Sequence, residues 1–134
     1  MKSSEFIFEA RTAATAWVIL HTANKLILGK RSPSTKNPNL WNFFGGHIDT
    51  GESPAVAAAR ELAEETGAQI NPASLKLISQ IGDSYYFSAL LPNAGALSTT
   101  QEISAIKAYK LTDLPNNLHS KTQNFFDRLD NLLK

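Results

Sequence analysis

Three glutamates in one short stretch of the chain have the spacing needed to bind a metal ion together. The stretch covers residues 45–68 and reads GGHIDTGESPAVAAARELAEETGA. Glu61 lies three residues before Glu64 and four before Glu65, so on a helix all three side chains would project from neighbouring parts of one face. Each like-charged pair at this spacing costs about 0.2–0.5 kcal/mol in an isolated helix. A divalent cation bound between them would turn this repulsion into attraction.

The chemistry of the three side chains indicates which metal they would hold. Carboxylates with no histidine or cysteine alongside favour Mg²⁺ or Mn²⁺ over zinc or copper. Mg²⁺ also often bridges protein carboxylates to the phosphates of a substrate. A solvated acidic helix end that binds nothing would show the same pattern. Arg60, four residues before Glu64, would offset only part of the repulsion.

The residues around the glutamates predict the helix that would present them. Ser53 suits the N-cap, Pro54 suits the first helical position, and Gly67 suits the position just past the end. The residues between them are rich in alanine and leucine, which favour helices. Just upstream, the aromatic run 41–48 indicates a strand broken by its two glycines, where the backbone must bend or meet another group closely.

The rest of the sequence predicts strands on both sides of this helix and a second helix at the C-terminus. Apolar residues bounded by turn residues indicate strands at 15–20, 26–30, 75–81, 84–91 and 103–111. The last segment carries apolar residues at helical spacing: Phe125, Phe126, Leu129, Leu132 and Leu133. This order of elements suggests an α/β fold in which a mixed sheet lies between helical layers.

The composition fits one globular domain over residues 1–134. Hydrophobic residues make up 43% and charged residues 19%, which is ordinary for such a domain. The net charge of +1 gives no overall attraction to DNA or to an anionic membrane. The longest apolar run near the N-terminus, 13–20, is too short to cross a bilayer, and no signal peptide pattern precedes it. The chain has no cysteine, which fits a reducing compartment, so we expect a cytoplasmic protein.

The residues around the glutamates form a specific motif. They follow the pattern G-x5-E-x7-R-E-U-x-E-E-x-G, where U is apolar: Gly46, Glu52, Arg60, Glu61, Leu62, Glu64, Glu65 and Gly67. This motif resembles the Nudix box of the Nudix hydrolase family, and its seven fixed residues would match by chance about once in 10⁸ starting points. The family usually has Ile, Leu or Val after the last glycine. Here Ala68 stands there, which should slightly weaken packing of the helix on the sheet and leave the chemistry unchanged.

The resemblance implies a Nudix-type α/β/α sandwich with a central mixed β-sheet and a metal site. Mg²⁺, with Mn²⁺ as an alternative, would be held by four groups: the carbonyl of Gly46 and the carboxylates of Glu61, Glu64 and Glu65. Glu52 and Arg60 would hold the helix and the preceding loop in place. The general base varies within the family. One of the box glutamates, or Glu102 on the loop before the last strand, is a candidate to accept the proton of the attacking water, although Glu102 could equally be a surface charge.

Candidate substrate contacts lie at the start of the motif and outside it: Lys30, Arg31, Phe44, Gly45, Tyr86 and Asn117. The two cations end a predicted strand and could reach distal phosphates, and the glycine allows close approach to metal or phosphate. The aromatic rings, or Trp41, could stack on a base. The amide of Asn117, or of Asn116, could pair with a base edge. Each also has a structural explanation as a solvated strand end, a core ring or a turn residue.

The resemblance further implies hydrolysis of a nucleoside diphosphate linked to another group. The short build is similar to the MutT-like (deoxy)nucleoside triphosphate pyrophosphohydrolases, including those that remove oxidised nucleotides, which release the monophosphate and pyrophosphate. A nucleotide sugar such as a GDP-hexose, or a dinucleoside polyphosphate, is an alternative substrate. The expected partner is therefore a small-molecule nucleotide, bound by a monomer or a homodimer.

Two other functions stay open. An RNA 5′-end pyrophosphohydrolase would need a basic surface for the RNA, which the near-neutral net charge disfavours. A non-catalytic Nudix module that senses a nucleotide would usually have lost box glutamates. This chain keeps all four, at positions 52, 61, 64 and 65, which favours an enzyme.

Overall fold

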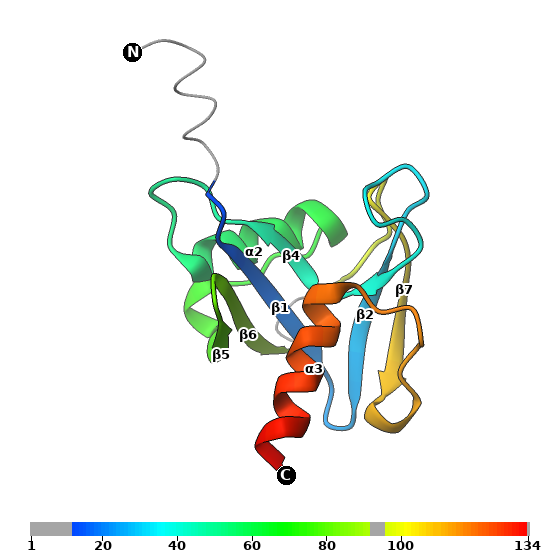
Figure 1. Ribbon diagram of the computed structural model, residues 1–134. Helices are drawn as coiled ribbons and strands as arrows, with labels where there is room; N and C mark the ends of the chain where they lie inside the picture. The colour runs from blue at the N-terminus through cyan, green and yellow to red at the C-terminus, as the bar shows by residue number, and fades with distance from the viewer. Residues whose placement is uncertain (1–11, 92–95, 134) are drawn as a thin grey trace.

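The computed structural model describes residues 12–91 and 96–133, with side chains up to residue 129. In this part of the chain, seven strands form one sheet with a helix on each face (Figure 1). The strands are β1 (Thr15–His21), β2 (Lys25–Arg31), β3 (Trp41–Asn42), β4 (Phe44–His47), β5 (Lys76–Ile81), β6 (Ser84–Leu90) and β7 (Ile103–Lys110). The helices are α2 (Pro54–Thr66) and α3 (Ser120–Leu133), and two short 3₁₀ turns are η1 (Pro72–Ser74) and η3 (Leu111–Asp113).

The central strand β1 makes the sheet mixed. It pairs in parallel with β6, from Thr15 opposite Ser84 to His21 opposite Leu90, and antiparallel with β2 and β4. β5 forms a hairpin with β6 at one edge, and β3 and β7 both pair with β2 on the other side. The structure therefore confirms the predicted α/β fold with a mixed sheet between helical layers.

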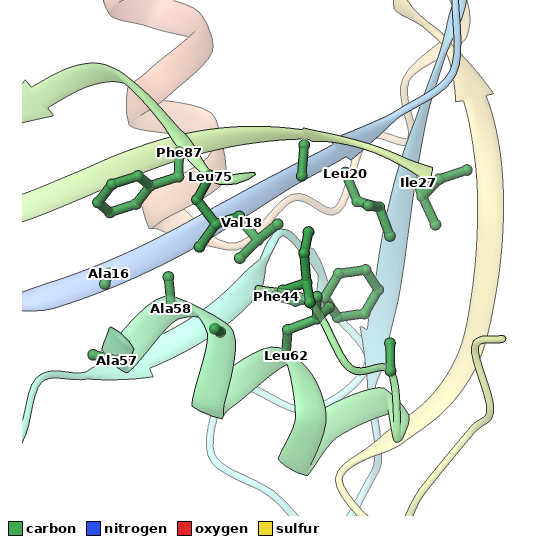
Figure 2. Packing of buried hydrophobic residues seen from close by; sticks show 14 of the residues in the cluster. Ala16, Val18, Leu20, Ile27, Phe44, Ala57, Ala58, Leu62, Leu75 and Phe87 are labelled. Atoms are coloured by element: carbon green, nitrogen blue, oxygen red, sulfur yellow. The ribbon is translucent and has the colours of Figure 1, made fainter. Parts of the chain in front are cut away.

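Small side chains allow α2 to pack closely on the sheet. Ala57, Ala58 and Leu62 are fully buried against β1 and against Phe44 of β4 (Figure 2). Ala68, just past the helix, belongs to the same cluster and is 1% exposed. Close packing here matters for function because it presses the glutamate-bearing helix against β4.

The opposite face of the sheet is covered by α3 through an aromatic cluster. Phe125 and Phe126 of the helix pack on Trp17, Phe43 and Tyr86 of the sheet. The rings of Phe43 and Phe125 meet edge to face, with centroids 5.6 Å apart and planes at 82°, a favoured aromatic arrangement. The predicted amphipathic C-terminal helix is therefore present, and Figure 1 shows it crossing the front of the sheet while α2 lies behind.

The run 41–48 is interrupted at Phe43, so the predicted break at its glycines is wrong. Gly45 and Gly46 lie within β4, paired with Trp17 and Ala16 of β1. A Cβ atom at Gly45 would lie only 2.6 Å from the Trp17 ring. These glycines are needed because other groups approach the backbone closely, which is the second of the two explanations that the sequence allowed.

Candidate active site

Caps at both ends of α2 determine where its glutamates lie. The Ser53 hydroxyl accepts a hydrogen bond from the Val56 N–H at 3.2 Å, as expected of an N-cap. Gly67 adopts a left-handed conformation with φ of 77°, and its N–H donates to the Ala63 carbonyl at 2.8 Å. The helix therefore begins and ends where the sequence predicted, and its last turns place the three glutamates beside β4.

Glu65 is a buried carboxylate with one hydrogen bond. It is 3% exposed, and its Oε1 accepts from the Gly45 N–H at 2.9 Å. Burial raises the pKa of its carboxyl group well above the usual range, and the negative charges of Glu61 and Glu102 act in the same direction. The ionised form is thus unfavourable here unless a cation joins it.

Glu61 lies against the backbone of β4. A Cβ atom at Gly46 would lie 2.8 Å from the carboxyl carbon of Glu61 and 2.9 Å from both of its oxygens. A larger residue at position 46 would therefore force this carboxylate to move from its place. Burial raises the pKa of Glu61, the charge of Glu64 adds to this, and the cation of Arg60 opposes it.

Arg60 connects the helix to the loop before it. Its Nε and Nη2 donate to the two oxygens of Glu52 at 2.8 and 3.0 Å, and Nη2 also donates to the His47 carbonyl at 3.1 Å. Its Nη1 donates to one oxygen each of Glu61 and Glu64 at 3.1 Å. The hydrogen bond from Arg60 is the main reason that the pKa of Glu52 is lowered. These contacts join α2 to the loop before it, and the role of the pair in positioning the metal ligands stays a prediction.

A cavity of about 480 Å³ opens beside the last turns of α2. Glu61, Glu64 and Glu65 line it, and Glu102 reaches it from the segment before β7. The negative charge of Glu102 raises the pKa of both Glu61 and Glu65, so it lies close to them. The structure thus brings together the four carboxylates that the sequence singled out as catalytic candidates.

Two of the predicted substrate contacts line the cavity. Arg31, at the end of β2, and Gly45 both lie on its wall. Lys30 precedes Arg31 in the same strand, where successive side chains point to opposite faces, and it does not line the cavity. Of the two cations at this strand end, only Arg31 lines the cavity.

The predicted aromatic and amide contacts serve the fold and not the cavity. Phe44 is fully buried under α2, and Tyr86 is 1% exposed with its hydroxyl donating to a backbone oxygen of α3 at 2.7 Å. Trp41 packs edge-on against Tyr109, with centroids 5.2 Å apart. The amide of Asn117 donates to a backbone oxygen of the loop before β3 at 2.7 Å. These groups are satisfied by other parts of the protein, because the sheet needs both faces covered.

Several cavity residues were not identified from the sequence: Trp17, Lys36, Asn37, His47, Asp49, His119 and Lys121. They come from β1, from the loop after β2, from the end of β4 and from the start of α3, and no spacing links them. One signal was available. A histidine and a lysine flank Ser120, the first residue of α3, where the helix dipole favours acidic side chains.

The donor set fits a hard divalent cation. All the candidate ligands are oxygens, which suits Mg²⁺ or Mn²⁺, and Glu65 is a buried carboxylate with only one hydrogen bond. Among residues 12–91 and 96–129, no three acidic, histidine or cysteine side chains converge into a ready-made cage. Arg60 engages one oxygen each of Glu61 and Glu64, which leaves the second oxygen of each carboxylate available to a cation.

Comparisons with known proteins agree with this geometry. A family model described as "NUDIX domain" matches residues 10–129. The chain is 36% identical over 75 residues to an RNA pyrophosphohydrolase of Francisella tularensis subsp. mediasiatica, a match that covers 56% of the chain and 44% of the relative. It is 42% identical over 50 residues to a putative 8-oxo-dGTP diphosphatase of Bacillus subtilis, covering 37% and 31%. The chain thus spans less than half the length of these curated relatives.

Solved structures show the same fold. A MutT NUDIX hydrolase from Burkholderia pseudomallei superimposes with a TM-score of 0.71 at 21% identity, covering 85% of this chain and 95% of that one. A MutT protein from Methanosarcina mazei Go1 gives a TM-score of 0.67 at 20% identity, covering 90% and 94%. At these identities the likeness concerns the fold alone, whereas the match over residues 10–129 concerns the family.

Proposed function

Because the chain belongs to the Nudix hydrolase family, we propose that it hydrolyses a (deoxy)nucleoside triphosphate, or an oxidised nucleotide, to the monophosphate and pyrophosphate. The observation that carries this proposal is the buried Glu65 beside Glu61, next to a cavity lined by three further carboxylates, those of Asp49, Glu64 and Glu102. Such an arrangement is costly in a protein without a cation and useful in one that binds metal-complexed phosphates. The family generally uses divalent metals, and we propose Mg²⁺, with Mn²⁺ as an alternative.

In this proposal, Glu61, Glu64, Glu65 and the Gly46 carbonyl would hold the metal. A bound divalent cation would neutralise pyrophosphate oxygens and make a water more acidic. Attack of a water oxygen on phosphorus would form one P–O bond, break one phosphoanhydride P–O bond and give the monophosphate and pyrophosphate. Glu102 is our candidate to accept the water proton, because it lines the cavity outside the helix and remains free of Arg60.

The surrounding residues hold these carboxylates in place. Arg60 and Glu52 fix α2 against the preceding loop, so that the carboxylates are presented before the substrate arrives. Arg31 supplies a positive charge on the cavity wall for phosphate oxygens. Gly45 positions Glu65 by donating its N–H to that carboxylate.

The test is Mg²⁺-dependent release of pyrophosphate from a panel of nucleotides. Glu64→Gln and Glu65→Gln keep size and remove charge, and each should lower kcat/KM by about 10²-fold or more. Asp127→Asn, an exposed carboxylate on α3, is the matched control and should retain wild-type activity. Turnover of either glutamine variant within a few-fold of wild type, or substantial turnover in excess chelator, would contradict the proposal.

A second candidate substrate is the 5′ end of an RNA. The relative from Francisella tularensis, named an RNA pyrophosphohydrolase, shares 36% identity over 75 residues, which cover 56% of this chain. The panel should therefore include a 5′-triphosphate oligoribonucleotide beside free nucleotides, a nucleotide sugar and a dinucleoside polyphosphate. Binding of a nucleotide without turnover would instead identify a sensing module.

The remaining expectations stay predictions. They are a single domain over residues 1–134, a cytoplasmic location and a monomeric or homodimeric state. In the described parts of the chain, no helix combines the length and the apolar character needed to span a membrane.

A further inference from the structure

One wall of the cavity consists of hydrogen-bond donors. We call it the donor wall and define it by five side chains: Arg31, Lys36, Asn37, His119 and Lys121. They come from the end of β2, from the loop that follows it and from the start of α3. None of them belongs to the motif that carries the carboxylates.

The backbone determines the protonation of His119. The N–H of Lys121 donates to His119 Nδ1 at 3.1 Å, so Nδ1 must be unprotonated and the ring proton must be on Nε2. Burial lowers the pKa of His119, and the nearby charges of Arg31 and Lys121 lower it further. His119 is therefore a neutral imidazole whose Nε2–H is a donor.

This tautomer in turn orients Asn37. The Asn37 Nδ2 atom lies 3.3 Å from His119 Nε2. Because Nε2 carries the ring proton, the amide accepts that proton only when its oxygen takes the place of Nδ2, and its NH₂ group is then left as a donor. Asn37 has a φ of 56°, a left-handed conformation that asparagine tolerates better than most residues. The loop after β2 is thus held with a donor at the cavity.

The three cations of the donor wall have no carboxylate partner. Every ion pair among the described residues involves Arg60, and none involves Arg31, Lys36 or Lys121. Arg31 Nε donates to the Lys36 carbonyl at 2.7 Å, which fixes the guanidinium and leaves its two Nη groups for another partner. Lys121 Nζ donates only to the Ser84 hydroxyl, at 3.1 Å.

Lys121 is also held in place by a buried network. Ser84 is 3% exposed, and its hydroxyl lies 2.9 Å from that of Thr15, which accepts from the Trp17 indole N–H at 2.9 Å. The lysine stands in the first turn of α3, where the helix dipole disfavours a cation. An anchored cation at an unfavourable position, in a cavity, indicates that its counter-ion comes from outside the protein.

We propose that the donor wall binds the terminal phosphoryl group of a substrate that carries at least three phosphates in a row. The proposal rests on the proposed function, since the carboxylate end of the cavity would hold the metal-complexed phosphates at which cleavage occurs. A phosphoryl group is anionic and offers only acceptors, which matches a wall of donors. A hexose or a base edge offers donors as well, and these would find only the Asn37 amide oxygen as a free acceptor among the five side chains.

The first test measures binding without metal or turnover. Inorganic triphosphate is titrated into the protein in excess chelator by calorimetry. Wild type and Glu64→Gln should bind it, Lys121→Met should bind about tenfold more weakly or worse, and Lys121→Arg should recover most of the affinity. Lys76→Met, an exposed lysine on β5, is the matched control and should bind like wild type. Equal affinity of wild type and Lys121→Met, or no binding by either, would overturn the proposal.

The second test compares substrates during Mg²⁺-dependent turnover. Lys121→Met should lower kcat/KM about tenfold for a nucleoside triphosphate or for a 5′-triphosphate RNA, mainly through KM, and change it less than twofold for a nucleoside diphosphate hexose. A loss confined to the free nucleotide, or to the RNA, supports the proposal and identifies the source of the phosphoryl group. An equal loss for the nucleotide sugar would overturn it. If wild type cleaves nothing, the proposed function fails, while the binding test still decides the role of the donor wall.

Discussion

Replacing Glu65 by glutamine should stabilise the metal-free protein while abolishing its response to metal. The ionised carboxylate is 3% exposed and receives one hydrogen bond, from the Gly45 N–H. Burying an ion costs several kcal/mol even after relaxation. Glutamine keeps the acceptor for Gly45, but its NH₂ group lacks a partner, which costs about 1–3 kcal/mol. We therefore expect a net gain of about 1–3 kcal/mol at pH 8, or about 3–9 °C in Tm for a chain of this size.

The change of this stability difference with pH is a second, independent test of its sign. Burial raises the pKa of Glu65 well above its unfolded-state value of 4.5. Because the folded-state pKa is raised, the contribution of protonated Glu65 to the free energy of unfolding is fully present below pH 4.5. This contribution is lost as the pH rises through the folded-state pKa. The advantage of Glu65→Gln should therefore be small at pH 4.5 and larger at pH 8.

The assay is thermal unfolding with and without metal. In chelator, wild type and Glu65→Gln are compared at both pH values. Mg²⁺ at about 100 times its dissociation constant should then stabilise wild type by about 2.7 kcal/mol and leave the variant almost unchanged. Glu64→Gln is the control. Its side chain is 53% exposed, so its metal-free stability should stay within about 0.5 kcal/mol of wild type although its metal response is lost. A Glu65→Gln variant that is less stable than wild type at pH 8, or equally shifted at both pH values, would refute the reasoning.

Three further predictions concern the residues that support the site. Arg60→Lys keeps the charge but loses the planar pair of donors that holds the preceding loop. Urea unfolding should therefore show a free energy of unfolding lower by about 1–2 kcal/mol, and titration with Mg²⁺ should show a weaker affinity. Gly46→Ala would put a Cβ atom 2.8 Å from the Glu61 carboxyl carbon. The displaced carboxylate should lower Mg²⁺-dependent kcat/KM at least about tenfold. Near-normal turnover would show that the carboxylate has room to move. Thr122→Val would leave the buried Phe43 N–H without its acceptor, now 3.0 Å away, and should lower the free energy of unfolding by about 1–3 kcal/mol in calorimetry, with kcat/KM for the intact fraction little changed.

The local chemistry of α2 was predictable because its signals are contiguous. Ser53, Pro54 and Gly67 bound the helix in the sequence and in the structure. Helical spacing then places Glu61, Glu64 and Glu65 on one side without knowledge of any other element. The strands were found for a similar reason, because alternation and turn residues act over a few positions. Apart from the run 41–48, which forms two strands, their observed bounds differ from the prediction by at most one residue at either end.

The substrate side of the cavity was not predictable in this way. Phe44 and Tyr86 had the right chemistry to stack on a base, but the sheet buries one under α2 and the other under α3. Asn117 was the amide considered for base recognition, whereas Asn37 is the one that lines the cavity. A side chain's type gives its chemistry, and only its neighbours decide whether that chemistry is free for a ligand.

The sequence by itself determined the family, the helix that carries the carboxylates and the kind of metal they suit, because these depend on spacing within one segment. The tertiary structure alone decided that Glu65 is buried, that Glu102 joins the cluster, and that Arg31, His119 and Lys121 share the cavity. Burial and charge proximity are properties of residues far apart in the chain. They are set when β1 pairs with β4 and β6 and the two helices cover opposite faces of the sheet, which no local pattern encodes.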